Sequence, residues 1–464
     1  MTEAYQDWRD AERRARAEKR DAERRNAAPI TEESAAAEFV ARHRDALLFD
    51  HHQGAWFHWA GSHWQREGTC MAFDWARQVA HDISEMESPN EQKKIRRTAF
   101  AGGVERFCRA DRAFAVTSEH WDADPFLLGT PTGTVDLRTG KLRKATPTDR
   151  ITKITGASPD EKADCPRWLA FLMQSTGGDI ELIRWLQQWC GYCLTGDTRA
   201  HALAFVYGSG GNGKSVFLNV VTGIMADYAT TAAMGTFTAS HNDKHPTDLA
   251  MLRGARLVTA SETEDGRAWA EARLKSLTGG DPITARFMKR DFFTYTPQFK
   301  LTVIGNHKPV LVNVDDAARR RFNIVPFTCK PEKPDQELEQ KLRAEWPGIL
   351  RWMIDGCLDW QANGLVLPEV IASATDAYFN DQDLVGQWLE DDCHADPTDR
   401  NIAATSAALF DSWKAYAVRA GEEPGSSKAF ADRLQRRGIM RTRGTGGVRL
   451  YRGVRLLVPA GHVE

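Results

Sequence analysis

The sequence predicts an α/β protein with a phosphate-binding-loop core, preceded by an α+β domain and followed by a winged-helix-like module. Three observations support this fold class. Residues 208–215 match the phosphate-binding pattern G-x-x-x-x-G-K-[ST] at every constrained position. Apolar runs of strand length recur between residues 202 and 327, separated by helical patterns and turns. Residues 428–455 combine a helical pattern and two short strand patterns with a concentration of positive charge.

Composition places the chain among soluble globular proteins. It has 464 residues, 42% hydrophobic and 27% charged, which is enough for roughly three domains. No apolar run approaches the ~20 residues that span a bilayer, and the N-terminus is charged, so we expect a cytoplasmic protein without a membrane partner. Eight cysteines over this length do not indicate a disulfide framework. The net charge of −2 leaves nucleic-acid binding to local clusters.

The chain divides into five segments. The first is polar and Arg-rich, but interleaved acidic residues favour a solvated helix or a disordered arm over a nucleic-acid-binding arm. The expected segments are the arm at 1–33, the α+β N-terminal domain at 34–165, the core with its leading helices at 166–330, a helical connector at 331–369 and the basic module at 370–464.

The N-terminal domain is expected to combine helices with β-hairpins. A helix begins near Ser34 and leads to Asp50. Alternating apolar and polar residues at 54–64 predict a hairpin. Residues 70–120 have helical patterns, and the turn-rich residues 127–142 predict further hairpins.

Three groups of candidate metal ligands are interpreted as structural. His58 and His63 fall on a half-exposed ribbon rather than converging as zinc ligands do. The Asp-Ala-Asp sequence at 122–124 follows no apolar strand and precedes a proline, which indicates a loop. The C-x-x-C sequence at 190–193 lies on an amphipathic helical pattern that extends over 168–194, and no second pair follows, so core packing is favoured over zinc or redox chemistry.

The phosphate-binding loop lies between a strand pattern at 202–207 and a helical pattern at 216–224. In such a loop the backbone N–H groups turn toward a phosphate chain, and the helix N-terminus faces the anion. Lys214 is expected to reach the β- and γ-phosphates, and the Ser215 hydroxyl to bind Mg²⁺. Nucleotide contacts are expected from every residue of the loop, namely Gly208, Ser209, Gly210, Gly211, Asn212, Gly213, Lys214 and Ser215.

Two further strands end in polar residues that suit ATP hydrolysis. The strand at 256–260 leads into Glu262, whose carboxylate can polarise the attacking water or hold Mg²⁺; Glu264 is the second candidate. The strand at 299–305 leads into Asn306, whose amide can sense the γ-phosphate or orient water. The sequence therefore predicts an ATP hydrolase that uses ATP and Mg²⁺.

Two basic turns follow the same strands. Residues 283–287 and 292–295 can pair as a hairpin, which places Lys289 and Arg290 at a tip suited to a phosphodiester backbone; a solvated basic turn fits the pattern equally well. Arginines at 319–321 can include a finger for a neighbouring subunit's nucleotide, or form a surface turn.

The basic module carries nine basic residues and one acid in residues 428–455, a local charge of +8. A helix at 430–437, followed by strands at 439–443 and 448–451, predicts a winged helix. Such a charge cluster binds phosphate backbones by counterion release, so binding should weaken as salt rises. The DNA contacts expected here are Arg436, Arg437, Arg441 and Arg443.

As a set, the motifs GSGGNGKS, ASETED, LTGGDPITAR, VIGNHKP and DDAARRRFNIVPF resemble the superfamily 3 helicase core, and more closely the poxvirus and phage/plasmid primase-helicase type. FLLGTPTGTVDLRTGKL and WCGYCLTG resemble the N-terminal region of the same family. The resemblance covers about residues 45–330, and it implies an AAA+-like ATPase that forms a hexameric ring around DNA.

The resemblance also implies roles for individual residues. The loop at 208–215 corresponds to Walker A, Glu262 to the Walker B acid and Asn306 to sensor 1. Lys289 and Arg290 correspond to the DNA-contacting hairpin. The trans-acting finger corresponds to Arg320 or Arg321.

The chain departs from the family pattern in two places. Ser261 precedes Glu262, where related helicases often have two adjacent acids. Family members often begin with a primase domain, whereas about 200 residues precede the loop here and carry no primase metal motif, so a separate primase or loader is expected as a partner.

The function expected from the sequence is an ATP-dependent DNA helicase for replication of a phage, plasmid or mobile element. It would act as a homo-oligomeric ring on single-stranded or forked DNA. The alternative is a DNA-binding initiator or defence NTPase that uses ATP hydrolysis as an assembly switch without processive unwinding.

Overall fold

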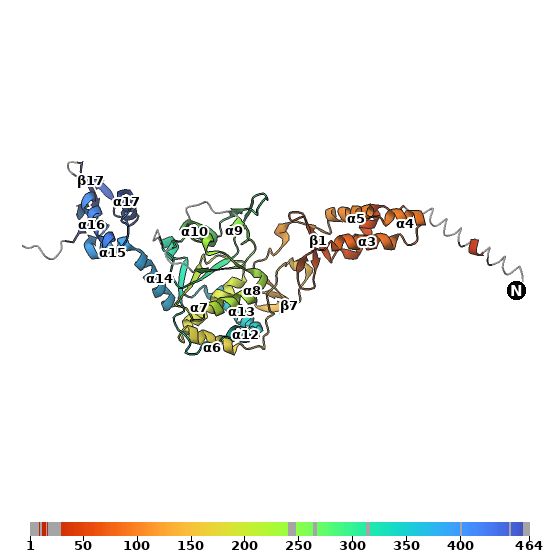
Figure 1. The fold of residues 1–464 in the computed structure, drawn as a ribbon, viewed down its shortest axis with the longest axis horizontal. Coiled ribbons are helices and arrows are strands. Elements are labelled where there is room, and N and C mark those ends of the chain that lie inside the picture. The colour runs from red at the N-terminus through yellow and green to blue at the C-terminus, as the bar shows by residue number, and fades with distance from the viewer. Residues whose placement is uncertain are drawn as a thin grey trace, which may run out of the picture. The chain divides into compact units, whose positions relative to one another are not determined.

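The computed structural model is a mixed α/β structure with 45% helix and 18% strand. The residues it describes are 9, 12–14, 16, 29–239, 247–262, 267–311, 316–399, 401–444 and 447–457. The chain divides into two compact units, Met1–Thr134 with Arg143–Ile154, and Val135–Leu142 with Thr155–Glu464. The ribbon is shown in Figure 1. The arm expected at 1–33 lies mostly outside the described residues.

The first unit packs helices on one sheet of order β3-β2-β1-β4. Its elements are α2 (Glu32–His43), β1 (Leu47–Asp50), β2 (Ala55–Trp59), β3 (Trp64–Arg66), α3 (Met71–Ile83), α4 (Pro89–Ile95), α5 (Thr98–Ala110) and β4 (Ala115–Val116). The hairpin predicted at 54–64 is confirmed as the antiparallel pair β2–β3, and the helical patterns at 70–120 as α3 to α5.

The helix expected from Ser34 to Asp50 is shorter than predicted. It starts at a capping box, in which the Thr31 hydroxyl accepts a hydrogen bond from the Ser34 amide at 3.1 Å, and it ends at His43. Leu47 to Asp50 instead form β1, which is buried along its whole length. A short, fully buried apolar run has no period that separates strand from helix, which explains the error. The turn-rich stretch at 127–142 forms strands as expected, namely β5 (Leu127–Thr130), β6 (Gly133–Asp136) and β7 (Lys141–Arg143).

The second unit contains a five-stranded parallel sheet of order β14-β8-β13-β10-β9. The strands are β8 (Leu203–Tyr207), β9 (Ala229–Thr231), β10 (Leu257–Glu262), β13 (Lys300–Gly305) and β14 (Phe322–Pro326). The strands predicted at 202–207, 256–260, 299–305 and 322–327 are thereby confirmed within one or two residues. Parallel strands need crossovers on the sheet faces, so both faces are covered and the strands are nearly continuous apolar runs.

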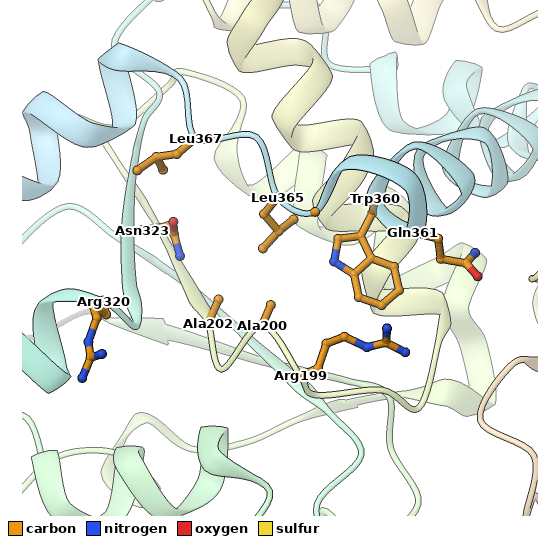
Figure 2. A pocket seen from close by; sticks show the side chains of 10 residues that line it. Arg199, Ala200, Ala202, Arg320, Asn323, Trp360, Gln361, Leu365 and Leu367 are labelled. Atoms are coloured by element: carbon orange, nitrogen blue, oxygen red, sulfur yellow. The ribbon is translucent and has the colours of Figure 1, made fainter.

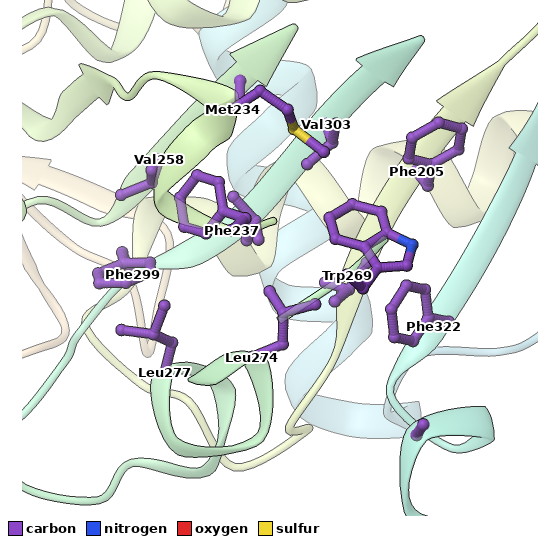
Figure 3. Packing of buried hydrophobic residues seen from close by; sticks show 14 of the residues in the cluster. Phe205, Met234, Phe237, Val258, Trp269, Leu274, Leu277, Phe299, Val303 and Phe322 are labelled. Atoms are coloured by element: carbon purple, nitrogen blue, oxygen red, sulfur yellow. The ribbon is translucent and has the colours of Figure 1, made fainter. Parts of the chain in front are cut away.

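One face of this sheet carries a large apolar cluster. Phe205 of β8, Val303 of β13 and Phe322 of β14 contribute to it, and Trp269 packs edge-on against Phe205 and Phe322 (Figure 3). Helices and short segments complete the layer, namely α9 (Thr247–Ala250), α10 (Glu271–Gly279) and α11 (Asp316–Arg319). This core holds the strand ends rigidly, which is what a site at the sheet edge requires.

A helical group belongs to the same unit and comprises α6 (Pro166–Ser175), α7 (Ile180–Leu194), α8 (Lys214–Met225), α12 (Leu338–Arg343) and α13 (Trp346–Asn363). The backbones of α7 and α13 touch through glycines. A Cβ on Gly191 would lie 2.1 Å from the Cys357 nitrogen, and one on Gly356 would lie 2.0 Å from the Gln187 carbonyl oxygen. Arg184 adds a two-bond ion pair with Asp359. These contacts fix α7 and α13 as one rigid pair.

The last part of the chain has its own core. Helix α14 (Glu369–Gln382) belongs with the sheet, because Tyr378 and Phe379 pack in the sheet's apolar cluster. This last part comprises α15 (Leu384–Asp392), β15 (Cys393–Ala395), β16 (Ala403–Thr405), α16 (Ser406–Arg419), α17 (Ser427–Arg436), β17 (Arg441–Arg443), β18 (Arg449–Arg452) and β19 (Val454–Leu456). Trp388, Trp413 and Phe430 pack against one another at its centre. The predicted helix followed by a hairpin is confirmed as α17 and the antiparallel pair β17–β18. Among the described residues, no helix is long and apolar enough to cross a membrane.

Candidate functional site

The carboxyl ends of three parallel strands lie in one row. Tyr207, the last residue of β8, is in register with Gly305 of β13, and Gly305 is in register with Glu262 of β10. The phosphate-binding loop starts directly after Tyr207, and Asn306 directly follows Gly305. The structure therefore brings the loop, Asn306 and Glu262 to the same sheet edge. The Glu262 side chain and the whole of Glu264 lie outside the described residues.

The loop is anchored to the end of β14. The side-chain amide of Asn212 donates a hydrogen bond to the backbone carbonyl of Phe327. The backbone N–H of Phe327 in turn donates to the Tyr207 carbonyl at 2.7 Å. Gly208 lies in the resulting gap, where a Cβ would come within 1.9 Å of the Phe327 carbonyl oxygen. Only glycine fits at that position, so the first glycine of the motif is required by packing.

Lys214 is buried at the start of α8, with its ammonium inside the loop. It donates hydrogen bonds to the Gly208 carbonyl at 2.5 Å, the Ser209 carbonyl at 3.1 Å and the Asn212 Oδ1 at 2.9 Å. Burial lowers the pKa of Lys214, and the positive charge of Lys330 lowers it further. A buried ammonium requires such acceptors, and a phosphate oxygen can replace them because it carries full negative charge.

Helix α6 closes one side of the loop. Gly213 is the residue before α8 and has φ +86°, and a Cβ on it would lie 2.7 Å from the Phe171 ring and 2.9 Å from the Ser175 hydroxyl. Ser215, in the first turn of α8, is exposed. The loop and the N-terminal turn of α8 thus form an open cradle of backbone N–H groups, with one hydroxyl available to a cation.

The structure separates the three neighbouring arginines. Arg319 donates to Asp376 at 2.8 Å and to Asn380 at 3.1 Å, so α14 holds it. Arg321 is half-buried and donates to the Ala317 carbonyl of the preceding helix α11 at 2.7 Å, while its Nε is buried and has no hydrogen-bond partner among the described residues. Arg320 is exposed, with one weak bond at 3.3 Å.

Arg320 lines a cavity of about 540 Å³ at the opposite edge of the sheet (Figure 2). The lining residues include Ala202, directly before β8, and Arg320, just before β14, so the cavity lies at the amino ends of strands whose carboxyl ends carry the loop. Arg199 lies in the same cavity over the Trp360 ring, 5.5 Å from the centroid, and its Nε donates to Asp197 at 2.7 Å. The sequence did not predict a role for Arg199, because a basic residue in the turn before a strand matches no known motif.

The basic hairpin predicted between the strands is present. β11 (Ile283–Ala285) pairs antiparallel with β12 (Phe293–Tyr295), and Lys289 and Arg290 are exposed in the connection. Lys289 has φ +59°, a left-handed conformation that turns the chain sharply. Three large apolar side chains are exposed beside the two cations, namely Phe287, Met288 and Phe292.

The predicted DNA contacts of the last module differ in their surroundings. The guanidinium of Arg437 pairs with Asp383 and also donates to the Arg433 carbonyl. Arg441 and Arg443 are exposed on β17, and Arg443 lies directly opposite Arg449 on β18. Arg436 is exposed at the end of α17. Like charges paired across two strands repel, so the hairpin favours an anionic partner.

The residues interpreted as structural have different surroundings, and the buried Nδ1 of His58 has no hydrogen-bond partner among the described residues. Cys190 and Cys193 are buried in α7, and burial raises the pKa of the Cys193 thiol to about 12, so it stays neutral. Asp122 lies in a loop, where its carboxylate accepts a hydrogen bond from the Thr152 amide at 2.9 Å. His63 bonds to its neighbour Ser62 at 3.1 Å.

Comparisons with known proteins found similar families, relatives and solved structures. Residues 36–176 match a family model described as D5 N terminal like, and residues 206–321 match a family of unknown function, DUF5906. A protein named "Putative helicase L207/L206" from Acanthamoeba polyphaga mimivirus is 24% identical over 326 residues, which is 64% of this chain and 34% of that protein. "Putative helicase 022R" from Frog virus 3 is 25% identical over 234 residues, covering 45% and 24% of the two chains.

This chain therefore spans about a third and about a quarter of the lengths of those two relatives. Among solved structures, the apo C-terminal region of NrS-1 (305-718) aligns over 89% of this chain and 97% of its own, with a TM-score of 0.48 and 12% sequence identity. The comparisons therefore show a region similar to the D5 N terminal like family, a second region similar to DUF5906, and similarity to viral proteins named as putative helicases.

Proposed function

We propose that this protein is an ATP-dependent DNA helicase that acts in phage, plasmid or mobile-element replication, moving as a ring on DNA in the cytoplasm. The observation that carries the proposal is the row formed by Tyr207, Gly305 and Glu262 at one sheet edge. It supports an AAA+-like ATPase core, because a phosphate-binding loop, an acid and an amide follow or end three adjacent strands at the same edge of the sheet.

The residues present fit MgATP. Lys214 holds its ammonium against loop carbonyls that a triphosphate can replace, and Gly208 and Gly213 leave no Cβ in the cradle. The Ser215 hydroxyl and the Glu262 carboxylate are oxygen donors of the kind that Mg²⁺ accepts. Mg²⁺ bound there would neutralise charge on the β- and γ-phosphates.

The chain supplies the remaining roles from its own residues. Glu262 would polarise the attacking water, and Asn306 would orient that water or report the γ-phosphate. Of the arginines before β14, Arg320 is favoured as the trans-acting finger, because Arg319 is held by α14 and Arg321 turns back onto the preceding helix α11.

Two exposed basic surfaces support DNA as the polymer along which the proposed ring moves. The connection between β11 and β12 exposes Lys289 and Arg290, and the last module exposes Arg441 and Arg443 on a hairpin after a helix. That arrangement supports a winged-helix-like DNA-binding module in the proposed segment 370–464. The hexameric ring and a separate primase or loader remain parts of the proposal.

Strand displacement tests the proposal. Wild-type protein and Lys214→Ala would be compared on a forked duplex with ATP and Mg²⁺. Unwinding by wild type that is abolished in Lys214→Ala supports the helicase. ATP hydrolysis without displacement at any protein concentration would favour the initiator or switch, in which hydrolysis drives assembly alone.

The hairpin tip separates the same two functions more sharply. Lys289→Ala should abolish unwinding and leave DNA-independent ATP hydrolysis intact, because the tip contacts phosphates and not the nucleotide. Lys162→Ala, an exposed lysine in the loop before α6, is the matched control. Unwinding by Lys289→Ala at the wild-type rate would remove the proposed coupling element.

A further inference from the structure

The hairpin formed by β11 and β12 exposes large apolar side chains at its turn. Phe287 is 42% exposed, Met288 is 68% exposed and Phe292 is 59% exposed. Large apolar side chains that stay together in water give up the free energy of burial, so such a cluster is typical of a binding surface. Phe287 and Phe292 lie on either side of residues 288–291 and are called the aromatic tip below.

A row of rings along the hairpin holds Phe287 in place. Its ring stacks on Phe293 with 5.7 Å between centroids and 26° between planes, and Phe293 contacts Tyr295 at 6.0 Å. The Tyr295 hydroxyl donates to the Leu249 carbonyl of α9 at 2.6 Å, and the Arg253 guanidinium lies 5.1 Å from the centre of the Phe293 ring. The exposed ring of Phe287 is therefore one end of a row whose other end is tied to α9.

Phe292 is paired with a cation. The Arg286 guanidinium lies 4.7 Å from the centre of the Phe292 ring. Aromatic rings and guanidinium planes are the side-chain surfaces on which unpaired nucleobases stack. The second half of the aromatic tip therefore brings both kinds of surface to one place.

The backbone of the turn is strained. The Phe287 carbonyl accepts a hydrogen bond from the backbone N–H of Arg290 at 3.1 Å, and Lys289, the third residue of this turn, has φ +59°. Glycine is the usual residue at a left-handed third position, so a lysine there carries a conformational cost. Strain of this kind is concentrated at functional sites, which agrees with a binding role for the side chains around it.

The charges around the aromatic tip indicate the partner. Residues 286–292 contain three cations and one acid, Asp291, so their net charge is 3 − 1 = +2. Lysine is depleted in the cores of protein interfaces, whereas single-stranded nucleic acid presents a flat base and an anionic phosphate in every nucleotide. In a duplex the base faces are already stacked on one another. Rings interleaved with cations therefore match an unpaired strand.

We infer that the rings of Phe287 and Phe292 stack against unpaired nucleobases of a DNA strand, without preference for sequence, while the neighbouring cations hold its phosphates. This inference rests on the proposed function, because it requires the DNA strand to reach the hairpin. It adds base faces to the phosphate contacts of Lys289 and Arg290, and it explains why apolar side chains remain exposed between the charges.

Two oligonucleotides separate base contacts from phosphate contacts. Oligo(dT) and an abasic oligonucleotide of the same length carry the same phosphates, but only oligo(dT) has bases. Fluorescence anisotropy would measure the affinity of the full chain for each. Wild type should bind oligo(dT) about fivefold or more tightly than the abasic strand, because stacking on an aromatic side chain contributes at least that factor for each base.

Substitutions at the aromatic tip should remove this difference selectively. Phe292→Ala should weaken oligo(dT) binding by about fivefold or more and leave abasic binding unchanged. Lys289→Ala should weaken binding of both strands by the same factor and lower the slope of log K against log salt concentration by about 0.7. Phe107→Ala, at a 50% exposed phenylalanine of α5, is the matched control and should change neither affinity.

Two further variants show whether the ring itself is needed. Phe292→Tyr keeps an aromatic face and should bind oligo(dT) as wild type does. Phe292→Leu keeps an apolar side chain without a ring and should behave like Phe292→Ala. Phe292 is exposed, so these variants should fold, and thermal unfolding checks that they do. Near-ultraviolet irradiation with oligo(dT) that carries one 5-iododeoxyuridine should cross-link the base to Phe287 or Phe292, as mapped by mass spectrometry.

Four results would overturn the inference. Equal affinity of wild type for the two oligonucleotides would leave phosphate contacts alone, and the helicase proposal would stand. Normal oligo(dT) binding by Phe292→Leu would show that the ring is not required. Cross-links confined to other segments would place the bases elsewhere. A lower molar mass of Phe292→Ala with an unchanged oligo(dT) preference would make the tip a contact between copies.

Failure of wild type to bind either oligonucleotide has a different meaning. It would contradict the proposed function itself, and the inference with it, because no DNA strand would then reach the hairpin.

Discussion

The side chain of Asn212 donates a hydrogen bond to the backbone carbonyl of Phe327, which ties the phosphate-binding loop to the strand next to its own. The same side chain accepts a hydrogen bond from Lys214 at 2.9 Å through its Oδ1 atom. A position that the motif leaves unconstrained therefore holds both the backbone and the lysine of the loop in place.

Asn212→Ala should weaken ATP binding by up to about tenfold, because the loop loses the hydrogen bond to the Phe327 carbonyl that holds it in place, and a neutral hydrogen bond contributes about 0.5–1.5 kcal/mol. It should also lower the melting temperature, because the Phe327 carbonyl loses its donor. Isothermal titration with ATP and Mg²⁺ measures the first effect and calorimetry the second. Asn219→Ala, an exposed asparagine of α8 that bonds Glu339 at 3.0 Å, should change neither. Equal effects of the two substitutions would contradict this role.

Gly208→Ala should destabilise the unit and abolish nucleotide binding. The new methyl would lie 1.9 Å from the Phe327 carbonyl oxygen and 2.2 Å from the Asn212 amide nitrogen, so the loop must move. Overpacking of this kind costs about 1–3 kcal/mol. Gly235→Ala, where a Cβ meets nothing within 4 Å, is the control. Thermal unfolding and ATP titration check both variants, and normal binding by Gly208→Ala would show that the cradle is not rigid.

Lys300, at the start of β13, is buried with 1% exposure, and its ammonium faces backbone carbonyls. It donates to Thr195, to Asp197 at 3.2 Å and to Gln298 at 3.4 Å, and it lies 4.7 Å from the centre of the Tyr192 ring. It therefore fixes the turn that leads from α7 to the cavity lined by Arg199 and Arg320.

Burial, together with the nearby charge of Arg256, lowers the pKa of Lys300 to about 7, against opposing effects of Cys193, Asp197 and Cys357. Between about pH 7 and the ordinary lysine pKa of about 10.4, the unfolded chain binds more protons than the folded chain, so stability should rise with pH in that window. Lys300→Met should remove this rise. Urea unfolding at several pH values checks it, and an unchanged slope in Lys300→Met would assign the dependence to other groups.

Arg441→Gln should lower the salt dependence of DNA binding. Removal of one charged phosphate interaction reduces the slope of log K against log salt concentration by about 0.7–0.9. Arg437→Gln should in addition lower the melting temperature, because its guanidinium pairs with Asp383, the capping residue of α15. Fluorescence anisotropy over a salt series and thermal unfolding separate the two arginines. A slope unaffected by Arg441→Gln would remove this residue from the interface.

Local patterns in the sequence determined the elements that carry the candidate site. The loop at 208–215, the strand before it, the helix after it and the hairpins that expose Lys289 and Arg441 all follow from contiguous residues. Such features are predictable because glycine conformations, side-chain alternation and helix periods act over a few positions. The same approach failed at Leu47–Asp50, where a fully buried run has no informative period.

The tertiary structure decided which elements meet. It inserted β13 between β8, which leads into the loop, and β10, which ends in Glu262. Asn306 directly follows this middle strand. It engaged Arg319 with Asp376 and left Arg320 exposed, and it placed Arg199 over Trp360, far apart in the chain. Strand order and such pairings depend on burying whole faces of sheets and helices against one another. The free energy gained by this burial comes from the assembled core, so no local stretch of sequence determines it.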